Sequence, residues 1–398
     1  MHASSPCATD HGKLHPMRVL HIGKFWPPYA GGIERLAWDI CSGLARDGVQ
    51  VDVLAHAEPG CWRSSEHPDH GIRVHLAACL GQLAYAPVSP TFGVLLRRVI
   101  ARHQPQLLHM HLPNPSAFWA LALPAARRLP WVLHWHSDIA GVQTPASVRT
   151  LYRLYRPFET AQLRQAARII CTSPEYRERS ATLRPWLDKT CVIAPGSPPL
   201  PAVSEAARRA AAARWPGQGL RLLALGRLSH FKGFDVLLRA LTQVSGVQLL
   251  LVGDGECAPA LRAQVSELGL GGRVRLAGTL VGAERDAVYQ AAEAFCLPST
   301  ARSESFGLVL LEAMSVGLPI LASAIDGAGV LHVLDHGRAG RLVPPGDPKA
   351  LADALSEWVL QPHARRELGE AGYRRWQQHF TLEESASRIK ALYADLLA

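Results

Sequence analysis

The alternation of strands and helices, which occurs twice along the chain, constrains the fold most. A helical stretch over 33–46, closed by Gly48, separates the first two strand-like runs. In the first half, apolar runs of strand length lie at 18–22, 51–54, 107–110, 131–134 and 169–171. Strands that are joined by helices pair in parallel and are covered on both faces. The first half is therefore predicted to be a doubly wound α/β unit.

A proline-rich connection from Ala194 to Pro201 interrupts this series, which then repeats. The second set of strand-like runs lies at 222–225, 249–252, 274–276, 294–297 and 319–322. We predict two Rossmann-like domains, over 17–195 and 196–380, after a disordered extension over 1–16. Ligands of such sheets bind at the carboxyl ends of the strands.

Composition limits the partners and the compartment. The 42 Lys and Arg residues against 33 Asp and Glu residues give a net charge of +9. This charge suits an anionic diphosphate, a phosphate-bearing acceptor or an acidic membrane surface. Nucleic acid is not expected as a partner, because the basic residues are dispersed and no binding motif occurs. Eight scattered cysteines, the lack of a signal-peptide pattern and the lack of a long apolar run predict a cytoplasmic protein.

Two carboxylates stand eight positions apart, at Glu304 and Glu312. The apolar run from Phe306 to Met314 predicts a short buried helix that starts at Gly307 and is ended by Gly317–Pro319, with one carboxylate at each end, about 12 Å apart. The free N–H groups at a helix start favour a phosphate between them. The pair therefore indicates two acids that read hydroxyl groups on either side of a diphosphate. The alternative is a solvated loop residue and a surface charge.

Four motifs, which follow one another along the chain in the same order as in the family, resemble those of the retaining GT-B glycosyltransferases of family 4. They are Ser303–Pro319 around the two acids, Leu225–Leu238, Phe25–Glu34 and His134–Asp138. The resemblance implies two domains that face a cleft, a nucleotide-sugar donor and a last helix, 381–398, that packs back on the first domain. It also implies which residues form the site. Donor binding falls to Gly31, Gly32, Gly226, Arg227, Lys232, Glu304, Ser305, Phe306, Gly307, Leu308 and Glu312, and catalysis to His136, Arg227, Lys232 and Glu304.

Arg227 and Lys232 stand at a predicted strand end between Gly226 and Gly233. Cations aimed at a leaving diphosphate stabilise the charge that develops on it. The chain holds no Asp-x-Asp sequence, so protein cations are expected in place of a metal, and no cofactor is expected. A solvated loop is the alternative for the two cations, and a plain tight turn is the alternative for Gly31 and Gly32.

His136 is expected beside the transferred sugar, where it would position the sugar, stabilise charge or act as a base. A packing histidine at a strand end is the alternative. His109 with His111, and His134 with His136, form i, i+2 pairs that each share one strand face. A zinc site made of these four is a minor alternative.

The resemblance implies transfer of a hexose from GDP-mannose or a UDP-sugar to a glycan or a polyprenyl-linked or other lipid-linked acceptor. A nucleotide-sugar epimerase or hydrolase, or a silent nucleotide-sugar-binding protein, is the alternative. Two segments depart from the family pattern, at 193–198 and 323–329, and leave the donor contacts there open. Arg97, Arg98 and Arg102 on a predicted helix over 92–103 suggest docking on an anionic membrane, although the helix could simply cover the sheet.

Overall fold

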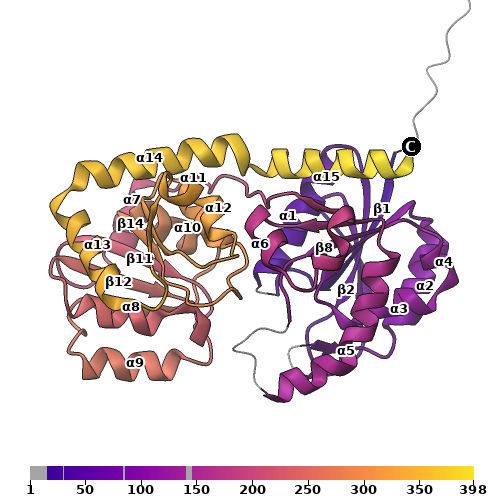
Figure 1. Ribbon diagram of the computed structural model, residues 1–398, viewed down its shortest axis with the longest axis horizontal. Helices are drawn as coiled ribbons and strands as arrows, with labels where there is room; N and C mark the ends of the chain where they lie inside the picture. Colours follow the sequence, from indigo (N-terminus) through magenta and orange to yellow (C-terminus); the bar gives the residue numbers. More distant parts are fainter. Residues whose placement is uncertain (1–15, 30, 84–85, 140–145) are drawn as a thin grey trace, which may run out of the picture.

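The computed structural model describes residues 16–29, 31–83, 86–139 and 146–398. Two α/β halves lie side by side, each built on a sheet with helices on both faces (Figure 1). The predicted extension over 1–16 lies almost wholly outside the described residues.

The first sheet has the strand order β10-β9-β8-β7-β1-β2-β4-β3. Its neighbours are parallel except β3 and β4, which pair in antiparallel fashion. The strands are β1 Arg18–Phe25, β2 Gln50–His56, β3 Ser65–Asp69, β4 Ile72–Ala77, β7 Leu107–Leu112, β8 Trp131–Trp135, β9 Arg168–Cys171 and β10 Thr190–Val192, and a separate hairpin joins β5 Gly81–Leu83 to β6 Ala86–Val88.

The second sheet is wholly parallel, in the order β13-β12-β11-β14-β15-β16. Its strands are β11 Leu220–Leu225, β12 Val247–Val252, β13 Val274–Gly278, β14 Ala294–Leu297, β15 Ile320–Ser323 and β16 Arg341–Val343. Strands covered on both faces are buried along their whole length rather than at alternate residues, as β12 shows with six buried residues in a row.

The helices divide between the two halves. Those of the first half are α1 Gly32–Arg46, α2 Phe92–His103, α3 Trp119–Ala122, α4 Pro124–Arg127, α5 Ala146–Gln165 and α6 Pro174–Arg179. The rest are α7 Glu205–Ala212, α8 Phe234–Leu241, α9 Ala258–Glu267, α10 Gly282–Ala291, α11 Leu308–Ser315, α12 Val330–Val333, α13 Pro348–Leu360, α14 Pro362–His379 and α15 Leu382–Leu397. Short 3-10 turns lie at Pro115–Phe118, Arg184–Lys189, His230–Lys232 and Asp335–Gly337.

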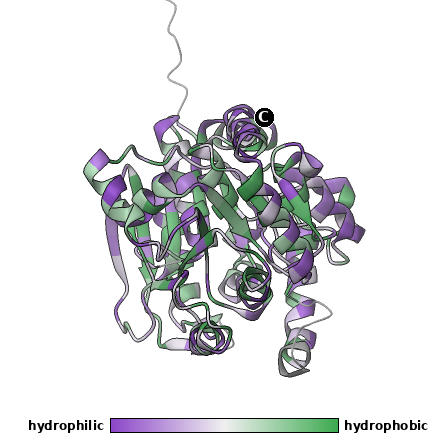
Figure 2. Cartoon of the chain, turned by 90° about the vertical axis from the view of Figure 1, so that its left-hand side faces the viewer, coloured by the Kyte–Doolittle hydropathy of each residue, from purple (hydrophilic) through white to green (hydrophobic). Residues whose placement is uncertain are grey.

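Hydrophobic residues concentrate in the strands and on the helix faces that cover them, with hydrophilic segments outside (Figure 2). Four apolar clusters result, one on each face of each sheet. Removal of this apolar surface from water is the main favourable contribution to folding.

The last two helices connect the halves. Helix α14 runs along the second half, and α15 continues in the same direction over the first (Figure 1). Ile389 and Tyr393 of α15 are fully buried among residues of the first sheet and of α1. The Lys390 ammonium donates to the Asp47 carbonyl at 2.7 Å. Helix α15 therefore completes the core of the first half.

Candidate functional site

The segment around Glu304 differs from the predicted arrangement of one carboxylate at each end of a helix. Helix α11 begins only at Leu308, because Gly307 adopts a left-handed conformation with φ of 82°. Glu304 therefore lies in the loop before the helix, and Glu312 lies inside the helix. The expectation of one carboxylate at each end of the helix is therefore wrong.

Glu304 is buried and forms an ion pair with Lys232, whose Nζ lies 2.5 Å from Oε2. The Ser299 hydroxyl donates to the same oxygen at 2.8 Å. Gly233 takes a φ of 66°, and a Cβ there would lie 2.1 Å from the Pro298 carbonyl oxygen. This close approach brings the Lys232 turn against the loop that carries Glu304. The structure thus joins two motifs that are about seventy positions apart.

Gly226 lets the turn after β11 pack closely against the Lys232 side chain. A Cβ on Gly226 would lie 3.4 Å from Lys232 Nζ, and the residue has a φ of 155°. The neighbouring Arg227 also interacts with other residues, and its charge acts on Lys24 and Glu34 of the first half. Together these residues place two cations beyond the carboxyl end of β11.

The start of α1 faces this group from the first half. A Cβ on Gly32 would lie 3.6 Å from Leu308 Cδ1, so the starts of α1 and α11 meet across the two halves. Phe306 is buried, while Ser305 is half-buried and its carbonyl accepts from the Gly329 N–H at 2.7 Å. Of the predicted residues from Ser305 to Leu308, it is Leu308 that lies against the start of α1, whereas Ser305 and Phe306 pack against Gly329.

Two further charged residues, Lys24 and Glu34, lie beside the start of α1. A Cβ on Gly31 would lie 1.9 Å from Glu34 Oε2, so the Glu34 carboxylate folds back over the start of its own helix. Burial raises the pKa of Glu34, which Lys24 and Arg227 partly oppose. Burial also lowers the pKa of Lys24. The Glu34 carboxyl group thus lies at the start of α1, where the helix dipole favours negative charge.

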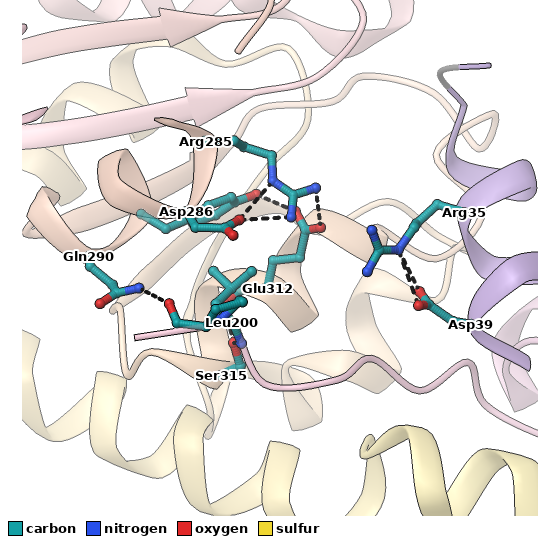
Figure 3. Close-up of polar contacts among 10 residues, drawn as sticks. Arg35, Asp39, Leu200, Arg285, Asp286, Gln290, Glu312 and Ser315 are labelled. Atoms are coloured by element: carbon teal, nitrogen blue, oxygen red, sulfur yellow. Dashed lines mark hydrogen bonds and ion pairs between the residues drawn. The ribbon is translucent and has the colours of Figure 1, made fainter. Parts of the chain in front are cut away.

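Glu312 belongs to a different surface of the cleft. Its Oε1 lies 3.2 Å from Arg285 Nη1, and its Oε2 accepts from the Tyr289 hydroxyl at 2.8 Å. Figure 3 shows the Arg285, Asp286 and Glu312 group across from Arg35 and Asp39 of α1. Burial raises the pKa of Asp39 to about 6.

A cavity of about 630 Å³ lies between these groups. Helix α1, the proline-rich connection, α10 and α11 line it, and Glu312 is on its wall, whereas Glu304 and Lys232 are outside it. The predicted site residues therefore fall into two groups, with Lys232 and Glu304 paired between the halves and Glu312 on the wall of the pocket.

His136 directly follows β8, and its backbone N–H donates to the Leu112 carbonyl at 3.0 Å. Two residues further on, Asp138 forms an ion pair with Arg302 of the loop before α11. His136 thus lies where the two halves touch. Its ring is buried, and burial lowers its pKa well below the usual value.

Helix α2 covers the first sheet with its apolar side. Phe92, Leu96 and Val99 are buried in the core, whereas Arg97 and Arg98 are exposed. Arg102 pairs with Glu66 at 3.2 Å. The apolar stripe is thus part of the core, and only the basic side faces outwards. Within the described part of the chain, no helix has the length and apolar character to cross a bilayer.

The fold, together with the cleft between the halves where Lys232 pairs with Glu304, defines a class. This class is the glycosyltransferases with two Rossmann-like domains. Residues 30–199 match the family described as Glycosyltransferase Family 4, and residues 208–375 match Glycosyl transferases group 1. The chain belongs to the family 4 glycosyltransferases, which have the GT-B fold. The predicted fold class and family are confirmed.

Individual relatives agree with this assignment. The chain is 32% identical to the D-rhamnosyltransferase WbpZ of Pseudomonas aeruginosa over 92% of each chain. It is 29% identical to the O-antigen chain mannosyltransferase C of Escherichia coli, over 96% of this chain and 99% of that one. Among solved structures, sucrose-phosphate synthase from Thermosynechococcus elongatus matches with a TM-score of 0.77 and 27% identity, over 96% of this chain and 99% of that one.

Several residues of the cleft escaped the sequence analysis. Lys24 and Glu34 flank the predicted glycines, and Arg285 and Tyr289 hold Glu312. Lys24 and Glu34 could have been found, since they border a glycine-rich turn between a strand and a helix. Arg285 and Tyr289 lie on a separate helix, and no sequence pattern connects them to Glu312.

Proposed function

We propose that the chain transfers a hexose from a nucleotide-sugar to a glycan or lipid-linked acceptor, with retention of configuration and without a metal ion. The observation that carries this proposal is the Lys232–Glu304 pair opposite the start of α1. It combines a cation for phosphate with a carboxylate for sugar hydroxyls in one narrow cleft.

In this proposal the diphosphate lies between the start of α1 and the start of α11. Arg227, Lys232 and Lys24 offset the charge that develops on the leaving phosphate. Glu304 turns from Lys232 to the hydroxyls of the sugar, and His136 contacts the same sugar from the first half. The nucleoside lies in the pocket beyond α11, where Glu312 accepts hydrogen bonds from the ribose. The pocket volume of about 630 Å³ is adequate for a nucleoside.

Mannosyl and rhamnosyl transfer by two relatives makes GDP-mannose the first donor to test, with UDP-sugars next. The same relatives support a place in polysaccharide or lipopolysaccharide assembly. The basic side of α2 supports peripheral contact with an anionic membrane at the cytoplasmic face.

A donor screen by thermal shift tests binding, since a ligand of the native state raises the unfolding temperature. Release of nucleoside diphosphate is then followed with and without acceptor glycans. Release that depends on the acceptor supports transfer. Release at the same rate without acceptor indicates a hydrolase, and binding without release indicates a silent protein. Full activity in EDTA is expected; loss on chelation that added divalent metal restores would contradict metal independence.

A further inference from the structure

Five buried histidines gather on one face of the first sheet. Strands β1, β7 and β8 are neighbours, and their registers place His21 beside His109 and His111 beside His134. Because alternate residues of a strand share a face, all five rings lie on the face that α1 and α15 cover. The five are His21, His109, His111, His134 and His136, each at most 4% exposed.

The rings form a single-file chain of hydrogen bonds with Tyr393 of α15. From the cleft inwards, His136 Nε2 meets His111 Nδ1 at 3.1 Å, and His111 Nε2 meets His21 Nδ1 at 3.2 Å. His21 Nε2 then meets the Tyr393 hydroxyl at 3.2 Å. The hydroxyl also bonds His109 Nδ1, and His109 Nε2 meets His134 Nδ1 at 3.2 Å.

Three proton arrangements satisfy every link of the chain. Burial lowers the pKa of every ring, to about 3 for His21 and His134, so all five are neutral near pH 7. A neutral imidazole has one N–H donor and one acceptor nitrogen, and a tyrosine hydroxyl has one proton to donate. Each link needs one donor and one acceptor, so all five rings carry their proton on Nδ1, or all five carry it on Nε2. In a third arrangement the Tyr393 oxygen accepts from both His21 Nε2 and His109 Nδ1, with Nε2–H on His136, His111 and His21 and Nδ1–H on His109 and His134.

The buried hydrogen-bond donors of the chain select between these arrangements. His134 Nε2 is buried and has no hydrogen-bond partner. A proton there would be a buried N–H without an acceptor, and such groups are rare in folded proteins. The arrangement in which the Tyr393 oxygen accepts twice leaves the buried Tyr393 O–H without an acceptor in the chain. With all five protons on Nδ1, each donor between two members of the chain has an acceptor, and His111 is the donor to His136 Nε2.

We infer that His111 is a positioning residue that holds His136 in the Nδ1–H tautomer, with the chain through His21 to Tyr393 orienting His111. His136 then offers a hydrogen-bond donor to the substrate and has no free lone pair to act as a base. This last step rests on the proposed transfer reaction, whereas the proton arrangement does not.

A metal site explains the arrangement of these five rings less well than the hydrogen-bonded chain does. Imidazole groups suit Zn²⁺, and the ligand nitrogens of His111, His134 and His136 lie within 4.8 Å of one another. However, both ring nitrogens of His111 are engaged in the chain. The rings of His134 and His136 stack with centroids 4.5 Å apart and planes 14° apart, so their edges do not converge on one point.

The first test is nuclear magnetic resonance of the full chain labelled with ¹⁵N-histidine, with His136 assigned from the spectrum of His136→Gln. We expect the Nδ1–H tautomer at all five rings near pH 7. A proton on Nε2 at any of the five would overturn the inference, as would bound zinc at one ion per chain in protein purified without added metal. This result is independent of any transferase activity.

The second test compares His111→Leu with His111→Gln. Leucine removes the donor to His136 Nε2, whereas the glutamine amide N–H replaces it. We expect kcat to fall about tenfold in His111→Leu, with KM for the donor changed less than about twofold, and to recover most of this loss in His111→Gln. Tyr393→Phe should cause a smaller fall of about threefold, and Tyr373→Phe on α14 is the matched control.

Wild-type kcat in His111→Leu, or an equal loss in His111→Gln, would overturn the positioning role. If the wild-type protein transfers no sugar, the proposed function fails, and the tautomers still decide the proton arrangement. If a variant does not fold, as its melting curve would show, the nuclear magnetic resonance spectrum of the wild-type protein still decides which ring nitrogens carry the protons.

Discussion

The two acids of the cleft have different surroundings, and this difference predicts different roles. Glu304 is paired with Lys232 near the proposed sugar position, so Glu304→Gln should lower turnover about 100-fold while affinity for the nucleoside diphosphate stays within about threefold. Glu312 faces the pocket, so Glu312→Gln should mainly weaken nucleotide binding. Steady-state kinetics and calorimetric titration with GDP and UDP separate the two effects. Glu205→Gln, exposed on α7, is the control. Wild-type turnover in Glu304→Gln would contradict the assignment.

Asp39 should make stability depend on pH. Its native pKa is about 6, against 3.8 for an ordinary Asp, so the native state binds the proton more tightly than the unfolded state. Stability should therefore fall as pH rises from about 4 to about 6. Asp39→Asn removes this dependence, and relative to wild type it should gain about 2 kcal/mol between pH 4.5 and pH 7. Urea unfolding of both proteins at the two pH values measures the difference. A constant difference between them would contradict the raised pKa.

At the scale of elements, α2 offers the clearest prediction about a partner. The chain should sediment with vesicles that contain anionic lipid at low salt and be released as salt rises. Each basic residue near such a surface contributes about 1 kcal/mol. Changing Arg97, Arg98 and Arg102 to Ser should therefore weaken binding by roughly 100-fold.

The matched control for this test changes Arg208 and Arg209 to Ser, because both are exposed on α7 of the other half. Equal loss in the control and in the α2 variant would indicate a general charge effect. Binding that the α2 variant retains in full would remove the docking role from this helix.

How far the elements follow from the sequence depends on the range of the interactions that fix them. The predicted strands are all present, since runs such as 249–252 are apolar throughout and need no partner to be recognised. Strand β3 was missed because its residues, Ser65–Asp69, are mostly exposed and polar, so that the apolar pattern of a strand is absent and pairing with β4 defines it. The start of α11 at Gly307 follows from the sequence, but Glu304 precedes that glycine and therefore lies in the loop before the helix. The hydrogen bonds of Tyr393 with His109 and His21 could not be predicted, because they join residues 284 and 372 positions apart.

At the scale of the whole molecule, the contact between α1 and α15 should be sensitive to one added methyl group. A Cβ on Gly43 would lie 2.8 Å from Ala386 Cβ, closer than such atoms pack. Gly43→Ala should therefore lower the free energy of unfolding by about 1 to 3 kcal/mol. Gly271→Ala is the control, since a Cβ there meets nothing within 4 Å. Chemical denaturation measures both, and equal midpoints for Gly43→Ala and wild type would contradict tight packing at this contact.

The return of α15 to the first half also affects the order in which a ribosome can complete the protein. Asp47 and Lys390, which are bonded in the native state, are 343 positions apart. At roughly 5 to 20 residues per second, about 20 to 70 s pass between the synthesis of these two residues. During that interval the nascent first half lacks the helix that buries the face with Cys41 and Ile40. We therefore expect the growing chain to depend on chaperones in this interval, and to lose that dependence once α15 has emerged from the exit tunnel.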